Sequence, residues 1–237
     1  MTKQDKVMYA QKNMANTWKC PDDSFIKNEN IIIKTDQAFF EIITFGYNAV
    51  IRTDKEIFKW CIENFSQIKA CHIMDGENLY MIEKKMREYG KKLAGEHIHY
   101  LHLYPEIIVK KPIGFSFELY EGDKIHTLYN DNRFDSALNY DTKGEILAIV
   151  AKKDNNIASI VAVDNYHQGF WQIGVDTIEM YRGNGLATYL VKEMALEGEK
   201  RGMISFYTTW SSNIASTRTA LCAGFSPVWI KYHAENV

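Results

Sequence analysis

The stretch EMYRGNGLATYL, Glu179 to Leu190, places two glycines behind an arginine and then continues into apolar residues at helical spacing. A glycine-rich turn that enters a helix is typical of phosphate sites, because the first backbone N–H groups of a helix lack partners and carry partial positive charge. Gly183 and Gly185 would allow positive φ and a close approach of the backbone to phosphate oxygens. A tight turn with an exposed arginine and no ligand is the alternative.

Two common phosphate loops do not match this stretch. A Walker loop requires G-x-x-x-x-G-K-[ST], and no lysine follows Gly185 at the required place. A dinucleotide fingerprint requires a third glycine, where Thr188 stands, and an acid about 20 residues further on. The next predicted strand ends in Thr208-Thr209-Trp210 instead. If the loop binds a phosphate, the ligand is therefore of another class.

The second half of the chain has a clear order of predicted elements. Three segments rich in β-branched and aromatic residues are separated by turns, which predicts consecutive antiparallel strands: residues 145–152, 157–164 and 169–177. After the glycine loop we predict a helix, a strand, a short helix capped by Ser211 or Ser212, and a last strand, over residues 186–202, 203–210, 211–224 and 228–232.

The first half predicts a mixture of helices and strands. Apolar periodicity indicates helices near residues 7–18 and 79–90, and alternation indicates strands over 38–45, 48–52 and 97–104. Thr53 and Glu56 have the spacing of a capping box for another helix, which would reach about Phe65. No linker rich in glycine, proline or serine separates the two halves.

The composition is that of an ordinary globular protein. Of its 237 residues, 46% are hydrophobic, and the formal net charge is -2, so no overall field attracts nucleic acid or an anionic membrane. The N-terminus has no apolar segment of a secretory signal, and the four cysteines show no C-x-x-C spacing. We therefore expect a cytoplasmic protein with free thiols and no membrane or nucleic-acid partner.

Residues 182–187 match the pattern R-x-x-G-x-A, and the chain from about residue 145 to 237 resembles the GNAT superfamily of N-acetyltransferases. The parts come in the superfamily's order: the three strands, the glycine loop and its helix, a strand, Asn213, and the pair Gly224-Phe225. The resemblance implies an α/β fold with a mixed, mainly antiparallel twisted sheet flanked by helices. It implies an acetyltransferase domain over 113–237, preceded by an N-terminal α/β region over 1–112. The sequence Gly185-Leu186-Ala187 also resembles acetyltransferases of the zwittermicin-resistance type.

The resemblance implies acetyl-CoA as cosubstrate and no metal. The pyrophosphate would lie on the glycine loop, the pantetheine arm would pair with the backbone of the preceding strand, and the short helix would contact the arm from the other side. The cofactor-binding candidates are Val175, Thr177, Arg182, Gly183, Asn184, Gly185, Leu186, Ala187, Asn213 and Ser216.

The implied reaction is direct attack of an amine on the thioester. Asp176 is the preferred base, with Gln172 and Glu179 as neighbours on the same stretch, and the backbone at Thr177 is the candidate oxyanion donor. Many members of the superfamily place a tyrosine seven residues after the asparagine as acid for the thiolate, but this chain has Ala220 there. Water, Ser216 or a tyrosine from elsewhere, such as Tyr207, could serve as the acid, or the thiolate could leave unassisted.

Several other residues near this region invite a functional interpretation. His97 and His99 share a face of a predicted strand and His102 does not, so we predict structural histidines rather than a metal site. His167 is a candidate proton relay. Trp210, Ser211 and Ser212 are candidates for contact with the acceptor.

The sequence thus predicts an N-acetyltransferase acting on a primary amine of a small molecule. A peptide or protein amine as acceptor, and a CoA-binding sensor without turnover, are the alternatives, and Ala220 and the weak base keep the last one open. The oligomeric state is open, and a homodimer is compatible with the sequence.

Overall fold

The structure is a computed structural model that describes residues 1–167 and 169–237, and it divides into two compact units. The first unit comprises residues 1–99 and 228–237, and the second comprises residues 100–227. Strands β4 (Lys91–His102) and β10 (Phe225–Asn236) have one end in each unit. The boundary predicted at residue 112 concerns the acetyltransferase domain and stays a prediction.

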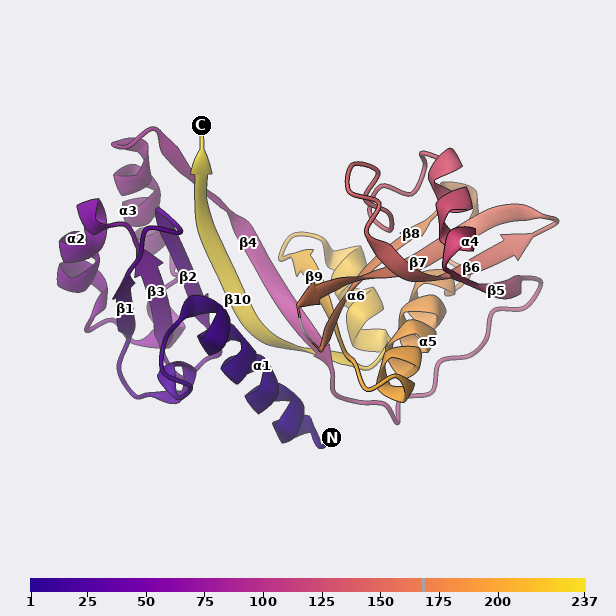
Figure 1. The fold of residues 1–237 in the computed structure, drawn as a ribbon, viewed down its shortest axis with the longest axis horizontal. Coiled ribbons are helices and arrows are strands. Elements are labelled where there is room, and N and C mark those ends of the chain that lie inside the picture. The colour runs from indigo at the N-terminus through magenta and orange to yellow at the C-terminus, as the bar shows by residue number, and fades with distance from the viewer. Residues whose placement is uncertain (168) are drawn as a thin grey trace. The chain divides into compact units, whose positions relative to one another are not determined.

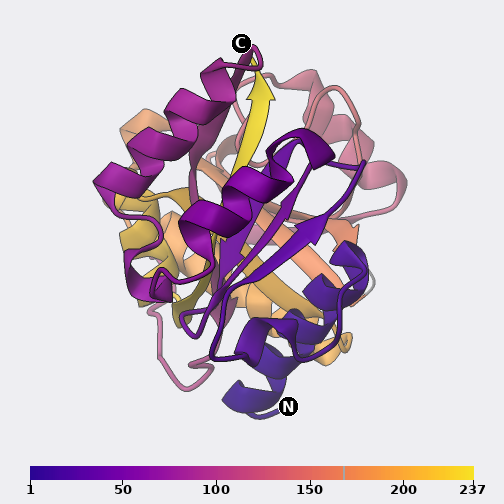
Figure 2. The same ribbon diagram turned by 90° about the vertical axis from the view of Figure 1, so that its left-hand side faces the viewer.

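The first unit is a sheet with helices packed against it (Figure 2). Its strands follow the order β1-β3-β2-β10-β4, in which β1 is parallel to β3, and β2 is antiparallel to both β3 and β10. Side chains from β2, β3, α2 and α3 form one apolar core, in which Phe40, Ile51 and Phe65 are fully buried. The elements are α1 (Lys3–Trp18), β1 (Ile31–Lys34), β2 (Phe40–Thr44), β3 (Ala49–Thr53), α2 (Lys55–Phe65) and α3 (Gly76–Arg87).

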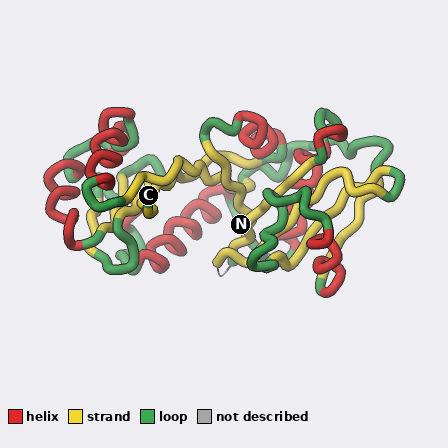
Figure 3. The backbone as a smooth tube through the Cα atoms, turned by 90° about the horizontal axis from the view of Figure 1, so that it is seen from above, coloured by secondary structure: helices red, strands yellow, loops and turns green. Residues whose placement is uncertain are grey.

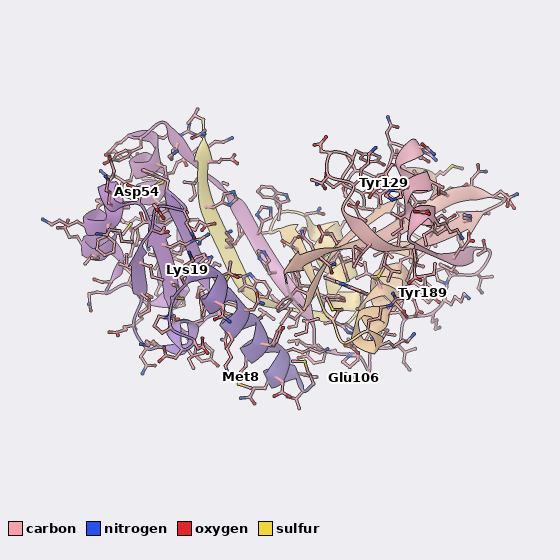
Figure 4. All side chains as sticks on the ribbon, viewed as in Figure 1. Met8, Lys19, Asp54, Glu106, Tyr129 and Tyr189 are labelled. Carbon is pink, nitrogen blue, oxygen red and sulfur yellow. The ribbon has the colours of Figure 1, made fainter. Side chains whose placement is uncertain are left out.

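The predicted capping box at Thr53 is wrong. Helix α2 begins after Asp54, whose carboxylate accepts a hydrogen bond from the N–H of Glu56, and Figure 4 labels Asp54 at this point. Thr53 is the last residue of β3, and its hydroxyl donates to the carbonyl oxygen of Phe39. Thr53 and Asp54 are both residue types that favour the N-cap position. Because Thr53 is still part of the paired strand β3, Asp54 caps the helix.

Among the described residues, the second unit contains five complete strands in the order β9-β8-β7-β6-β5, besides the ends of β4 and β10. All neighbours are antiparallel except β8 and β9, which are parallel. The predicted order of three strands, loop, helix, strand, helix and strand is confirmed. The elements are β5 (Ser116–Glu121), α4 (Asp123–His126), β6 (Glu145–Lys153), β7 (Asn156–His167), β8 (Phe170–Thr177), α5 (Leu186–Lys200), β9 (Ile204–Trp210) and α6 (Ile214–Cys222).

Different segments cover the two faces of this second sheet (Figure 1). On one face, α4, the short helix η3 (Thr127–Asn130) and the following loop pack against β6, β7 and β8, with Phe134 fully buried among them. On the other face, α5 packs against β6, β7, β8 and β9. Figure 4 shows Tyr129 of η3 and Tyr189 of α5 on opposite sides of the strands. The sequence did not predict β1, β5, α4 or η3, because these short segments lack a clear period.

The fold class is the predicted one, a mixed α/β protein with a mainly antiparallel sheet and flanking helices (Figure 3). No helix in the part of the chain that the structure describes has the length and hydrophobicity of a membrane span.

Of the three histidines of β4, His99 and His102 are buried. His99 stacks on Trp229 with ring centroids 4.7 Å apart, and burial lowers the pKa of its imidazole to about 3. His102 is buried, and its Nδ1 lies 2.9 Å from a carboxylate oxygen of Glu199. Within residues 1–167 and 169–237, no group of three potential metal ligands comes together.

Candidate functional site

The parallel strands β8 and β9 separate part-way along their length. Their pairing runs from Phe170 opposite Ile204 to Ile173 opposite Tyr207, and it stops there. Strand β8 continues to Thr177 and remains paired with β7 on its other side, while β9 continues to Trp210. A V-shaped gap therefore opens between the strands beyond the pair Ile173 and Tyr207.

Part of the backbone of β8 faces this gap rather than β7. In the antiparallel ladder, Ile178 donates to the carbonyl oxygen of Ala158, so alternate residues of β8, including Asp176 and Gly174, bond to β7. The N–H and C=O groups of the residues between them, Val175 and Thr177, therefore point toward the gap. An extended ligand could pair with this edge as an added strand would.

The glycine loop connects this edge to the start of α5. Gly183 and Gly185 have φ of 79° and 76°, a conformation that side chains other than glycine rarely adopt, and no atom would lie within 4 Å of a Cβ at either position. Gly185 is the N-cap residue of α5, no side chain in the described part of the chain caps the helix there, and its first turn contains no acidic residue. The first N–H groups of α5 are therefore available to an anion.

The two polar side chains of the loop differ in what they contact. The Nε of exposed Arg182 lies 3.3 Å from the carbonyl oxygen of Thr177, which holds the guanidinium between the loop and the gap. Asn184 donates to the carbonyl oxygen of Tyr181 at 3.0 Å, so its side chain shapes the loop. Leu186 is buried beneath the loop and anchors the helix, and Ala187 is half-buried.

Asn213 lies on the other side of the gap, at the start of α6. Its Oδ1 accepts a hydrogen bond from the N–H of Ser216 at 3.1 Å, so Asn213 is the N-cap residue. The predicted caps, Ser211 and Ser212, are both exposed and precede the helix, and that prediction is wrong. The amide Nδ2 of Asn213 is not needed for the cap and can donate to a ligand.

Asp176 lies on the face of the sheet that the loop after η3 covers. Its Oδ2 accepts hydrogen bonds from the N–H groups of Ser136 and Ala137, at 2.7 and 2.9 Å. Burial raises the pKa of this carboxyl, although the two N–H groups oppose the effect. The carboxylate is thus held in place and has a raised affinity for a proton. Gln172 is half-buried on the same face, and Glu179 is exposed at the start of a short helical turn, Glu179–Tyr181.

Tyr207 and Ser216 meet on the opposite face. The hydroxyl of Tyr207 lies 2.6 Å from that of Ser216, which is in the first turns of α6. Tyr207 is buried, and burial raises the pKa of its phenol, with Asp176 close enough to add to the effect. The gap therefore has a carboxylate on one face and a protonated phenol on the other.

The sequence matches the model of the GNAT acetyltransferase family over residues 53–228. The chain belongs to the GNAT acetyltransferase family. No curated protein matches the chain.

The similar solved structures include two GNAT proteins and a Drosophila protein. A GCN5-related N-acetyltransferase-like protein from Streptococcus suis is 16% identical, with a TM-score of 0.49, over 68% of this chain and 69% of the other. An acetyltransferase of the GNAT family from Colwellia psychrerythraea is 13% identical, with a TM-score of 0.45, over 61% of this chain. The match covers 57% of the Colwellia protein, less than two thirds of its length. A Drosophila protein is 10% identical with a TM-score of 0.51, over 98% of this chain and 88% of its own.

Two features of this GNAT site were not predicted from the sequence. Ser159 of β7 is fully buried, and its hydroxyl lies 2.6 Å from the carbonyl oxygen of Asp176 and 2.8 Å from the hydroxyl of Thr177. Gly174 lies against the loop after η3, where a Cβ would come within 2.4 Å of the carbonyl oxygen of Ser136. Serine in a strand carries no signal of such a role, and neither contact follows from local sequence.

The remaining candidates lie at the margins of the GNAT site. Trp210 is exposed at the end of β9, and its carbonyl oxygen accepts a hydrogen bond from the N–H of Asn213. The side chain of His167, a predicted relay, lies outside the described residues. Ala220 is fully buried in α6.

Proposed function

We propose that this chain is an acetyl-CoA-dependent N-acetyltransferase that transfers the acetyl group directly to a primary amine of a small molecule. One observation carries the proposal: the backbone edge of β8 at Val175 and Thr177, which faces away from β7 beyond the end of the pairing with β9, leads straight into a glycine loop and the start of α5, whose N-cap is a glycine. A ligand with an extended amide arm and a diphosphate at its end fits this combination, and acetyl-CoA has both.

In the proposed complex, the diphosphate lies against the N–H groups between Gly183 and Ala187, with Arg182 beside it. The partial positive charge of the helix start and the permanent charge of the guanidinium both favour the anion. The pantetheine arm pairs with Val175 and Thr177, and the amide of Asn213 meets the arm from the side of α6. The thioester then lies near the closed end of the gap, beside Ile173 and Tyr207.

The chemistry follows from the groups around that point. A neutral amine attacks the carbonyl carbon of the thioester, and Asp176 accepts the proton that the amine loses. A gap-facing N–H of the strand around Thr177, that of Val175, is the donor to the oxyanion of the tetrahedral intermediate, because Val175 lies nearer to the closed end of the gap. The intermediate collapses with cleavage of the carbon–sulfur bond, and the electron pair of that bond stays on the sulfur.

The acceptor is proposed to be a small amine, because Gly185-Leu186-Ala187 and the N-terminal α/β unit both resemble the zwittermicin-resistance type of acetyltransferase. We also propose a cytoplasmic location, since the cytoplasm holds the acetyl-CoA pool that the reaction needs. A homodimer is compatible with this proposal.

Calorimetry with acetyl-CoA and with CoA, followed by an assay of thiol release against a panel of small amines and amino-terminal peptides, tests the function. Binding of acetyl-CoA and thiol release with one small amine are the expected results. If only peptides cause thiol release, the acceptor is a peptide amine and not a small molecule. Binding with no release by any amine would support a CoA sensor, and absence of binding would refute the proposal.

Asp176→Asn is expected to lower kcat by at least about 100-fold, because the amide cannot accept the amine's proton. The amide oxygen of the asparagine can still accept hydrogen bonds from the N–H groups of Ser136 and Ala137. The urea concentration at the midpoint of unfolding should therefore stay close to that of the original protein. The matched control is Gln172→Asn, a change on the same face of β8 that removes no carboxylate. Equal rates for the Asp176 variant and this control would show that another group takes the proton.

A further inference from the structure

Position 220 raises a question about how the thiolate leaves. The family resemblance implies a tyrosine there, but Ala220 offers only a methyl group and is fully buried. The sulfur gains negative charge as the carbon–sulfur bond breaks, and a positioned hydrogen-bond donor stabilises such charge. Another residue of this chain or a water molecule must supply that donor if the reaction has one.

Tyr207 lies at the point where the two strands separate. It is opposite Ile173, which is the last residue of β8 that pairs with β9. Directly paired residues of parallel strands point to the same face, so Tyr207 and Ile173 project on the face opposite to Gly174 and Asp176. Tyr207 is only 4% exposed, so the residue is largely shielded from bulk water.

Helix α6 places Ala220 on the same face as Ser216, the residue that contacts the phenol of Tyr207. Ser216 and Ala220 are four residues apart and therefore lie on one face of α6. That face meets Tyr207, because the Ser216 hydroxyl lies 2.6 Å from its hydroxyl. The ring of Phe225 contacts the ring of Tyr207 with centroids 6.1 Å apart and holds it from a second side. A phenol from β9 thus stands on the helix face from which a tyrosine at 220 would project.

The protonation state of this phenol suits a donor. Burial raises the pKa of Tyr207, so the hydroxyl keeps its proton at neutral pH. The Ser216 hydroxyl can donate to the phenol oxygen, which leaves the phenol proton free to point elsewhere. Ser216 then positions the phenol rather than contacting the thioester.

We propose that Tyr207, oriented by Ser216, donates a hydrogen bond to the leaving sulfur in place of a tyrosine at position 220; this inference rests on the proposed function. The carbon–sulfur bond breaks, the electron pair passes to the sulfur, and the Tyr207 hydroxyl stabilises the resulting thiolate. The thiolate then takes a proton from water. The amine's proton is received by Asp176 on the opposite face, so the base and the sulfur's donor act from opposite sides of the gap.

The first test measures bound CoA and does not depend on turnover. A donor beside the sulfur stabilises the thiolate, so the pKa of the bound CoA thiol, followed by thiolate absorbance, should be at least about one unit lower in the original protein than in Tyr207→Phe. The control is Tyr100→Phe, which removes another buried hydroxyl, 3.5 Å from that of Thr217 on α6. This control should match the original protein.

The second test measures turnover with the best amine of the panel. Tyr207→Phe should lower kcat about 100-fold, with KM for acetyl-CoA changed less than about threefold, and Ser216→Ala should lower kcat about fivefold. Equal thiol pKa values and equal kcat for the Tyr207 and Tyr100 variants would overturn the inference, while turnover by the original protein would leave the proposed function standing. If CoA does not bind to the original protein, the proposed function fails, and this inference fails with it.

Discussion

A Gly185→Asp variant is expected to lose measurable binding of acetyl-CoA. The aspartate would bring its negative charge to the N-cap position of α5, directly beside the proposed diphosphate site. Two like charges about 4 Å apart at a protein surface repel by about 4 kcal/mol, which corresponds to about a 1,000-fold weaker Kd. The carboxylate would also accept hydrogen bonds from the first N–H groups of α5, as an N-cap does. The new side chain would thus occupy the anion site itself.

Gly202→Asp is the matched control for this experiment. Gly202 has φ of 73°, close to the 76° of Gly185, and it too has no atom within 4 Å of a Cβ. It follows α5 at its C-terminal end, about 22 Å from the loop, given a rise of about 1.5 Å for each of the 15 residues. The control therefore suffers similar backbone strain and should keep its affinity. If both folded variants bind acetyl-CoA equally well by calorimetry, the diphosphate lies elsewhere.

Gly224→Ala is expected to destabilise the protein by about 3 kcal/mol or more, which is among the larger effects of a single substitution. Gly224 has φ of 94°, and its Cβ would come within 2.4 Å of the carbonyl oxygen of Tyr104. The backbone cannot easily withdraw, because the carbonyl oxygen of Gly224 accepts hydrogen bonds from the N–H groups of Leu103 and Tyr104. Urea unfolding measures the loss.

Gly114→Ala separates the two causes of this effect. Gly114 has φ of 82° but no atom within 4 Å of a Cβ, so its substitution causes backbone strain without a clash and should cost about 1 kcal/mol. A loss at Gly224 equal to that at Gly114 would mean that the close approach to Tyr104 contributes nothing. The expected difference explains why the pair Gly224-Phe225 requires glycine.

Local sequence was sufficient where chain neighbours decide the structure. The turn at Gly183 and Gly185, the helix after it and the order of strands in the second unit were predicted correctly, since positive φ, helical periodicity and strand alternation all act within a few residues. The N-caps were predicted less well. Asp54 and Asn213 cap their helices rather than Thr53 and Ser211 or Ser212, because several good capping residues stand side by side and tertiary pairing selects one.

The sequence by itself determined the glycine loop, the family resemblance and the residue types that the site can use, among them Asp176 and Ala220. Only the tertiary structure decided where β8 and β9 separate, that Ser136 and Ala137 hold Asp176, and that the hydroxyl of Tyr207 meets Ser216. These contacts join residues that local patterns do not relate, 40 positions apart for Ser136 and Asp176. Strand register and the packing of helices on the two faces of a sheet set such distances, and neither is encoded by any short stretch of sequence.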